Sequence, residues 1–335
     1  MTFRDRLLLS WKKPTRLTFL LWPLSGVYRA LYATRKWLYR VGLFSSYRAS
    51  VPVIVVGNLT VGGTGKTPLV IHLVKLLRKH GYTPGVISRG YSGDAPYYPY
   101  QVTSNSPVNE SGDEPALIVK RTNVPMVVGS NRGKSIDTLL ANHSVDVIIS
   151  DDGLQHLALQ RDVEICLMDK TVEFANDHLL PAGPYREPLS RLSSIDLVVY
   201  HQKVSAETAE GRFTLSLVPS KPVRLIDNTG VSRLGLDKTQ AIHAVAGIGN
   251  PQRFFNTCEH EGYDFDAHSF PDHYHFSEED FRFNDAKPVL MTEKDAVKCQ
   301  HFTDQNLWYL PVDARLSDDF EKAFIGKVNR FKITR

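Results

Sequence analysis

A glycine-rich run, Gly57 to Thr67, carries the chemistry that is easiest to assign. It follows the apolar stretch Val51–Val56 and precedes a helical pattern over Pro68–His80. In a P-loop, glycines let backbone N–H groups wrap around phosphate oxygens, a lysine reaches the terminal phosphates and a hydroxyl holds Mg²⁺. The residues expected to form this nucleotide site are Thr60, Val61, Gly62, Gly63, Thr64, Gly65, Lys66 and Thr67.

The run departs from the usual P-loop spacing at one position. Thr60 stands where the first glycine normally lies, which leaves the compact string Gly-Gly-Thr-Gly-Lys-Thr of the deviant P-loops. ATPases of the ParA/MinD-like class have such loops and carry a lysine just before the glycines, where this chain has Val61. The alternative is a turn that binds nothing, but the strand, loop and helix patterns all favour a nucleotide site.

Two acids end a second apolar strand pattern. Val145–Ser150 is followed by Asp151 and Asp152. In P-loop proteins, an acid at the end of the strand beside the P-loop strand orders Mg²⁺ and its waters. A polar turn that caps the strand is the alternative. Gln155 and His156 come next, and we expect them to orient a nucleophile, a phosphate or a sugar, although His156 also suits a structural role.

Arginines follow several other expected strands and loops. Arg89 and Tyr91 come just after Pro84–Ser88, and therefore lie at the carboxyl edge of the sheet, where open α/β folds bind ligands. Arg132 and Arg186 lie in loops, where they are either further phosphate ligands or solvated surface.

A further pair of acids, Asp113 and Glu114, opens an expected helix. Acids in the first turn are stabilised by the helix dipole, so capping alone explains them. The functional alternative makes Asp113 a general base for an attacking hydroxyl. His273 lies in the string Phe-Pro-Asp-His-Tyr-His-Phe, which lacks further ligands at metal-site spacing, so a pairing of histidine and acid at the active site is favoured.

Short apolar strands alternate with helices between residues 50 and 200, which predicts a P-loop NTPase-like, doubly wound and mostly parallel sheet. Residues 92–112 are expected to form a long loop or hairpin beside the active face. Residues 201–240 are predicted to be a β-rich linker region, and residues 241–335 a second, smaller C-terminal α/β domain.

Residues 1–49 form a basic, amphipathic helical segment with ten Lys/Arg and one acid, in a chain whose net charge is +4. Its uncharged run Leu17–Tyr28 covers 12 residues, fewer than the roughly 20 that span a bilayer. We therefore expect an N-terminal membrane-surface helix on an anionic bilayer. The alternative is a helix that packs its apolar side on the body. The three cysteines are far apart and indicate neither a disulfide framework nor a cysteine metal site.

Eight strings, taken in order, resemble the tetraacyldisaccharide 4'-kinase (lipid A 4'-kinase) family. They are Gly-Asn-Leu-Thr-Val-Gly-Gly-Thr-Gly-Lys-Thr-Pro, Ser-Arg-Gly-Tyr, Gly-Asp-Glu-Pro, Asp-Asp-Gly-Leu-Gln-His, Leu-Pro-Ala-Gly-Pro-Tyr-Arg-Glu-Pro, Ala-Gly-Ile-Gly-Asn-Pro, Phe-Pro-Asp-His-Tyr-His-Phe and Thr-Glu-Lys-Asp-Ala-Val-Lys. The resemblance covers nearly the whole chain, to about residue 312.

The resemblance implies an ATP- and Mg²⁺-dependent kinase of lipid A biosynthesis. Its substrate would be the tetraacylated disaccharide 1-phosphate, at the cytoplasmic face of the bacterial inner membrane. It also implies a role for Lys66 at the ATP phosphates, for Asp113 as the base and for His273 as its helper. Around Mg²⁺ it places Thr67, Glu114, Asp151 and Asp152. The residues it implies for phosphate or sugar binding are Arg89, Tyr91, Arg132, Gln155, His156 and Arg186.

Neither a nucleic acid nor an obligate protein partner is expected. Two other functions remain open from the residues alone. One is a membrane-associated ATPase switch, which Val61 and the Asp113/His273 pair disfavour. The other is a nucleotide-dependent metal-insertion protein, which would use the histidines but lacks a Cys/His ligand cluster.

Overall fold

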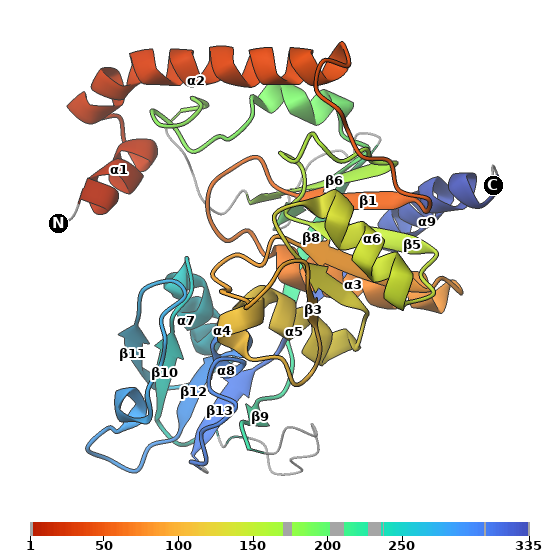
Figure 1. The fold of residues 1–335 in the computed structure, drawn as a ribbon. Helices are drawn as coiled ribbons and strands as arrows, with labels where there is room; N and C mark the ends of the chain where they lie inside the picture. Colours follow the sequence, from red (N-terminus) through yellow and green to blue (C-terminus); the bar gives the residue numbers. More distant parts are fainter. Residues whose placement is uncertain are drawn as a thin grey trace.

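A computed structural model describes residues 3–169, 176–201, 211–226, 236, 238–304 and 306–333. Its strands form two sheets, with a long helix lying across one end of the molecule (Figure 1). Among the described residues, nine strands form the large sheet, in the order β14-β8-β7-β6-β1-β5-β2-β4-β3. These strands are β1 (Val53–Gly57), β2 (Pro84–Ser88), β3 (Tyr100–Val102), β4 (Met126–Val128), β5 (Val147–Asp151), β6 (Val163–Asp169), β7 (Leu197–His201), β8 (Arg212–Pro219) and β14 (Val312–Leu316).

The large sheet is parallel except at its two edges, where β3 and β14 run antiparallel to their neighbours. Its central strands are apolar runs buried on both faces, as helices on both sides require. One face packs on α3 (Lys66–Lys79), α5 (Asp113–Thr122) and α9 (Asp318–Ile333). The other face packs on α6 (Arg132–Asn142). This is the predicted doubly wound fold.

The P-loop strand lies in the middle of this sheet. β1 pairs with β5 on one side and β6 on the other. The register sets Val56 beside Asp151, so the glycine loop and the acidic end of β5 leave the sheet at the same edge. The expectation that Asp151 and Asp152 follow the strand beside the P-loop strand is confirmed.

The small sheet has the order β11-β10-β12-β13-β9 among the described strands, with only β9 antiparallel. Its strands and helices are β9 (Val223–Arg224), β10 (Ile242–Ala246), α7 (Pro251–His260), β11 (Phe265–Ser269), β12 (Val289–Thr292), α8 (Glu293–Ala296) and β13 (Leu307–Leu310). The connections contain a short helix, α4 (Val108–Ser111), and two 3₁₀ turns, η1 (Leu189–Ser194) and η2 (Glu278–Phe281).

The chain passes between the sheets differently from the sequence-based expectation. β8, within the expected 201–240 linker, pairs with β7 in the large sheet, and β14 pairs with β8. Phe320 and Phe324 of α9 are fully buried in the same core as α3. Residues 241–335 are thus divided between the two sheets, because a strand's partner depends on distant residues. Residues 202–210 and 227–235 of the expected linker lie outside the described residues.

Residues 92–112 contain more structure than the expected loop or hairpin. β3 adds an edge strand to β4, and α4 follows it directly before α5. Close to this segment, Gly90 and Gly112 adopt positive φ angles of 71° and 87°, where glycine carries no steric penalty. The segment therefore folds back over the start of α5.

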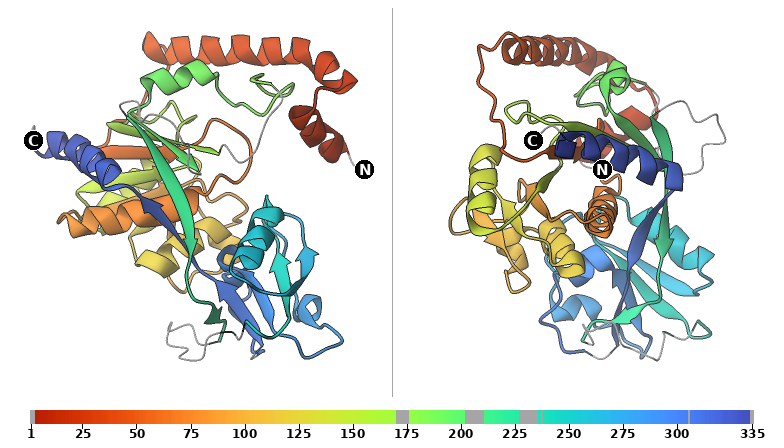
Figure 2. Two further views of the ribbon diagram at one scale, coloured as in Figure 1. Left: turned by 180° about the vertical axis from the view of Figure 1, so that it is seen from behind. Right: turned by 90° about the vertical axis from the view of Figure 1, so that its right-hand side faces the viewer.

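The N-terminal segment forms α1 (Phe3–Lys12) and α2 (Arg16–Arg40). The long helix α2 lies outside the two sheets, along one end of the molecule (Figures 1 and 2). It docks through polar groups: Ser25 Oγ donates to Leu179 O at 2.7 Å, and Tyr28 Oη donates to Arg186 O at 3.0 Å. Within the described residues, none of the helices combines the length and apolar character that a bilayer crossing needs.

Candidate active site

The P-loop is shaped by glycine conformations that other residues rarely adopt. Gly62 has a φ of 112° and Gly65 a φ of 89°, and α3 begins directly after Gly65. The positive end of the α3 dipole therefore faces the loop, as phosphate binding requires. Lys66 Nζ donates to Asn58 Oδ1 at 3.2 Å and lies 3.2 Å from Asp152 Oδ1. These two oxygens hold Lys66 inside the loop.

The two acids after β5 have different environments. Asp151 is fully buried, and this burial, with the negative charges of Glu114 and Asp152, raises its pKa to about 7. Burial also raises the pKa of Asp152, but the positive charges of Lys66 and Arg186 outweigh it and lower the pKa overall. Oδ1 of Asp151 lacks a hydrogen-bond partner among the described groups, whereas Oδ1 of Asp152 lies 3.2 Å from Lys66 Nζ. These are the properties of carboxylates arranged for a cation.

A segment from Leu179 to Glu187 braces the P-loop from outside. Val61 N donates to Pro184 O at 2.9 Å, and Arg186 N donates to Leu59 O at 2.7 Å. Gln155 Nε2 donates both to Asn58 O, at 3.1 Å, and to the buried carboxylate of Glu187, at 2.8 Å. This segment is also the one on which α2 docks, so it connects the outer helix with the phosphate loop.

A cluster of positive charge lies beside the acids. Arg132 is buried, its pKa is lowered to about 10 by burial, and its Nε has no hydrogen-bond partner among the described groups. Burial, followed by the charges of Arg132, Arg161, Arg35 and Arg89, lowers the pKa of His156 to about 4, so this imidazole is neutral near pH 7. Arg161 is paired with Glu164 at 3.1 Å, and Arg132 is partly balanced by Asp151 and Asp152. This group of arginines suits an anionic ligand. Arg186 lies 3.4 Å from Asp152.

Asp113 opens α5 as predicted, but its carboxylate does more than cap the helix. It is 4% exposed, and its Oδ2 is hydrogen-bonded to His273 Nδ1 at 3.0 Å. Burial raises the Asp113 pKa, whereas the hydrogen bond with His273 and the charge of Lys294 lower it, and the net pKa lies below its ordinary value. His273 has a φ of 60°, an uncommon conformation for a residue other than glycine. Tyr91 lies over it, with ring centroids 5.3 Å apart.

The loop that carries His273 reaches the P-loop. A Cβ placed on Gly249 would lie 3.1 Å from Asp272 Oδ2 and 3.7 Å from Gly63 N. Gly249 therefore lies between Asp272, the neighbour of His273, and the phosphate loop, and a side chain there would crowd the Asp272 carboxylate and touch Gly63. The Asp113–His273 pair and the P-loop consequently face the same region of the molecule.

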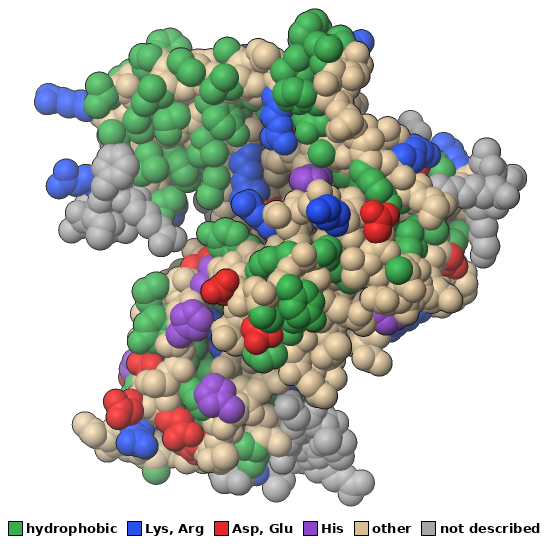
Figure 3. Space-filling model, in the orientation of Figure 1, with side chains coloured by type: hydrophobic (Ala, Val, Ile, Leu, Met, Phe, Trp, Pro, Cys, Tyr) green, Lys and Arg blue, Asp and Glu red, His purple; other side chains and the backbone are tan. Residues whose placement is uncertain are grey.

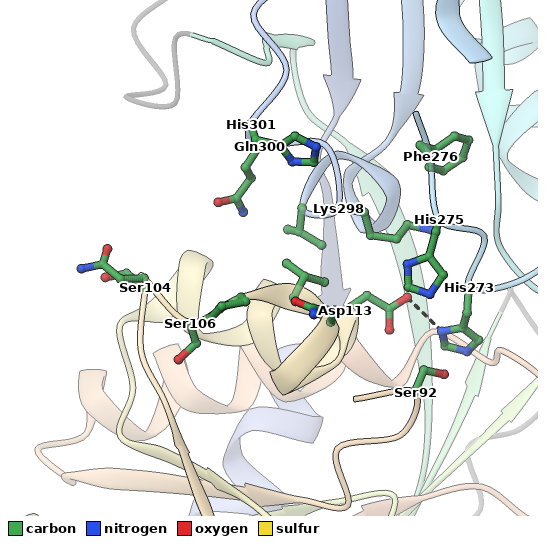
Figure 4. Close-up of a pocket in the computed structure, with 15 residues that line it drawn as sticks. Ser92, Ser104, Ser106, Asp113, His273, His275, Phe276, Lys298, Gln300 and His301 are labelled. Atoms are coloured by element: carbon green, nitrogen blue, oxygen red, sulfur yellow. Dashed lines mark hydrogen bonds and ion pairs between the residues drawn. The ribbon is translucent and has the colours of Figure 1, made fainter. Parts of the chain in front are cut away.

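A cavity of about 580 Å³ opens beside this pair (Figure 4). Asp113 and His273 line one side of it, with Ser104, Ser106 and Asn109 from the segment before α5. His275, Lys298 and His301 line it from the small sheet. Its wall is thus mostly uncharged and polar, with Asp113, Lys298 and three histidines as the titratable groups.

Sequence reasoning missed some residues of this site. Glu187 is buried and accepts hydrogen bonds from Gln155 and, at 2.7 Å, from Tyr32 of α2. Lys294 extends from α8 to the acids at the start of α5. The polar string Thr292–Asp295 directly after an apolar strand was a signal for Lys294, but its target is more than 170 residues away. No local pattern indicated that target.

A phosphate loop at the start of a helix, acids at the end of the adjacent parallel strand and a carboxylate–histidine pair define a P-loop phosphotransferase. The comparisons refine this class. The family model described as tetraacyldisaccharide-1-P 4'-kinase matches residues 17–329. Two relatives named tetraacyldisaccharide 4'-kinase, from Nitrosococcus oceani and Shewanella sediminis, are 47% and 48% identical over 92% and 94% of this chain. The alignments cover 89% and 92% of those relatives.

A crystal structure of LpxK from Aquifex aeolicus, in complex with ATP, superposes with a TM-score of 0.79 at 30% identity. The match covers 93% of this chain and 99% of that chain. This chain belongs to the tetraacyldisaccharide 4'-kinase family, whose members are ATP-dependent kinases of lipid A biosynthesis. The predicted resemblance, fold class and kinase activity are confirmed.

Proposed function

We propose that this site transfers the γ-phosphate of ATP to the 4'-hydroxyl of a tetraacylated disaccharide 1-phosphate, with Asp113 as the base. The observation that carries the proposal is the contact between two parts far apart in sequence. His273 is hydrogen-bonded to Asp113. Asp272, which precedes His273, lies next to Gly249, and Gly249 in turn lies next to Gly63 of the P-loop. A hydroxyl near Asp113 would thus meet a phosphate held by Lys66.

The carboxylates suit Mg²⁺, the ion expected with ATP. Asp151 is a buried oxygen donor with an unpartnered Oδ1 among the described groups, and the half-buried Asp152 carries a second carboxylate beside it; oxygen donors are what Mg²⁺ prefers. Thr67 and Glu114 are the further candidates to hold the ion or its waters. When bound, Mg²⁺ would neutralise phosphate charge. Lys66 and the basic residues Arg89, Arg132 and Arg186 would neutralise the rest.

Asp113 acts by orientation more than by basicity. Its lowered pKa makes it a weak base, but the transition state of phosphoryl transfer is loose and needs little proton removal from the attacking hydroxyl. A buried carboxylate hydrogen-bonded to His273 accepts the hydroxyl proton in one fixed direction. Tyr91, Gln155 and His156 lie around the same edge and are proposed to bind the sugar or its phosphate.

The outer face of α2 is proposed to lie on the anionic, cytoplasmic face of the inner membrane. Many of its large apolar side chains are exposed, and Figure 3 shows apolar groups gathered along this helix. The exposed members are Phe19, Leu20, Trp22, Leu24, Val27, Leu31 and Trp37, each more than half exposed. Withdrawing an acyl chain from lipid costs about 0.8 kcal/mol of free energy for each CH₂, so the enzyme must come to the bilayer.

The proposal is tested by incubating the protein with detergent-dispersed tetraacyldisaccharide 1-phosphate, Mg²⁺ and γ-labelled ATP. We expect label in the lipid with wild type, and a loss of roughly 10²–10⁴-fold in rate with Asp113→Ala. Asp319→Ala, an exposed acid on α9, is the matched control and should be unchanged. ATP hydrolysis without labelled lipid would instead favour the membrane ATPase switch. Full activity of Asp113→Ala would remove Asp113 from the role of base.

A further inference from the structure

Lys294 lies on the small sheet but contacts the acids of the large one. It is the second residue of α8, which follows the central strand β12. Its Nζ donates to Glu114 Oε1 at 3.3 Å, and lies 3.5 Å from Asp113 Oδ2 and 3.7 Å from Asp272 Oδ1. One cation thus bridges three carboxylates, two from the start of α5 and one from the loop that carries His273.

The backbone beneath Lys294 is held firmly. The fully buried Asp295 accepts hydrogen bonds from Gly247 N at 2.9 Å and from Thr292 Oγ1 at 2.6 Å. Thr292 in turn caps α8 by accepting from Asp295 N. These contacts fix a single turn of helix to the carboxyl edge of the small sheet. The long side chain of Lys294 therefore starts from a rigid base.

Glu293, the residue before Lys294, binds the other end of α5. Glu293 receives two hydrogen bonds of 2.8 Å from Arg121 Nη1, in the last turn of α5. The positive Lys294 meets the acidic start of α5, and the negative Glu293 meets its basic end. These two ion pairs, one at each end of α5, set the position of α5 and of Asp113 relative to the small sheet.

Lys294 stays charged in this setting. Its side chain is 20% exposed, and burial lowers its pKa, but the charges of Glu114, Asp113 and Asp272 outweigh burial and raise it above the ordinary value. Without this cation, three carboxylates would face one another at close range, and at Asp113 the charge of Lys298 and the hydrogen bond with His273 would remain to offset them. Like charges in a buried site repel strongly, so the carboxylates would move apart.

We propose that Lys294 is a positioning residue for phosphoryl transfer: it ties Asp113 of the large unit to the His273 loop of the small unit and holds the carboxylate in its reactive place. The inference rests on the proposed role of Asp113. Because Lys294 acts on the carboxylate and not on the P-loop, its loss should lower kcat while the KM for ATP changes little.

The experiment compares Lys294→Met with Lys294→Arg, which keeps the charge. Lys287→Met is the matched control, because Lys287 also pairs two carboxylates on the small unit, Asp266 and Asp285, at 2.7 and 3.3 Å. We expect Lys294→Met to lose roughly 10²-fold in kcat, as misplaced groups do, with the KM for ATP within about threefold of wild type. Lys294→Arg should recover at least part of the loss, and Lys287→Met should stay within twofold of wild type.

Adding Lys294→Met to Asp113→Asn separates this inference from the proposed base. If Lys294 works through Asp113, Lys294→Met should lower kcat little further once Asp113→Asn is present. If the fold-losses in kcat of the two single variants multiply in the double variant, the inference is overturned. The inference is also overturned if a folded Lys294→Met variant has a kcat within twofold of wild type, or if its loss lies entirely in the KM for ATP. An active Asp113→Asn would instead overturn the base itself. Should circular dichroism show that Lys294→Met is unfolded, Lys294→Gln takes its place with the same expectations.

Discussion

Asp113 and His273 form the residue pair on which the proposed chemistry depends most. The hydrogen bond between them raises the pKa of His273, while burial and the charge of Lys294 act against that rise. The same hydrogen bond lowers the pKa of Asp113 against the effect of its burial. Both shifts favour an ionised carboxylate beside a protonated imidazole. The pair is therefore a stability element as well as a proposed catalytic one.

Its contribution to stability should depend on pH in a defined way. A raised histidine pKa stabilises the fold fully below the unfolded value of 6.5, and the effect is lost as pH rises through the folded pKa. A lowered aspartate pKa stabilises it above 3.8, and the effect is lost as pH falls through the folded pKa. We therefore expect His273→Ala to lower the thermal midpoint most between pH 3.8 and 6.5, and less at pH 9.

Differential scanning calorimetry of both proteins across this range is the measurement. His301→Ala, an exposed histidine on the same cavity, is the control and should show no such window. A midpoint difference that is constant with pH would mean that the pair is not ionised as described.

At the scale of elements, α2 shows an inverted arrangement. Ser25, Tyr28 and Tyr32 make its hydrogen bonds to the body, and Tyr28 also packs on the apolar core, while large apolar side chains such as Leu20 and Leu31 are exposed. An ordinary surface helix buries its apolar side. The exposure of these side chains favours the membrane-surface helix over a helix that packs its apolar side on the body. Its Tyr32–Glu187–Gln155 contacts reach the backbone of Asn58 in the P-loop.

Removing part of this outer face should weaken membrane binding without harming the site. Leu20 is 74% exposed, and burying a leucine is worth about 1.5–3 kcal/mol, so Leu20→Ser should weaken binding to anionic vesicles by roughly 10–100-fold. Vesicle sedimentation measures this. Tyr97→Ser, 63% exposed but near β3, is the control. Equal binding of Leu20→Ser and wild type would rule out this face as the membrane contact.

At the scale of the whole molecule, the two units meet at several ion pairs and at Val297, which packs into the core of the large unit. The described interface includes Arg121–Glu293, Lys294–Glu114 and Arg253–Asp169 ion pairs. The chain crosses between the sheets after β8 and again before β14, and these two strands pair with each other. A polar interface joined by one two-stranded connection suits relative motion.

Nucleotide binding should therefore change protection from hydrogen exchange at this interface. With Mg²⁺ and a non-hydrolysable ATP analogue, we expect slower exchange in residues 247–251 and 292–298, which flank the P-loop and the α5 acids. Amides of α9, which is packed with α3 in the core of the large unit, serve as the internal control. Identical protection with and without nucleotide would argue against closure of the small unit over ATP.

Local patterns in the sequence determined the phosphate loop, the acids after β5 and the amphipathic α2, because each depends on residues close together in the chain. The eight strings determined the family and implied Asp113 and His273 as partners. Only the tertiary structure decided that β14 and α9 return to the large sheet, and that Lys294 and Glu187 join the site. Those contacts link residues far apart in sequence, and their partners are set by the packing of two sheets, which no local period or spacing encodes.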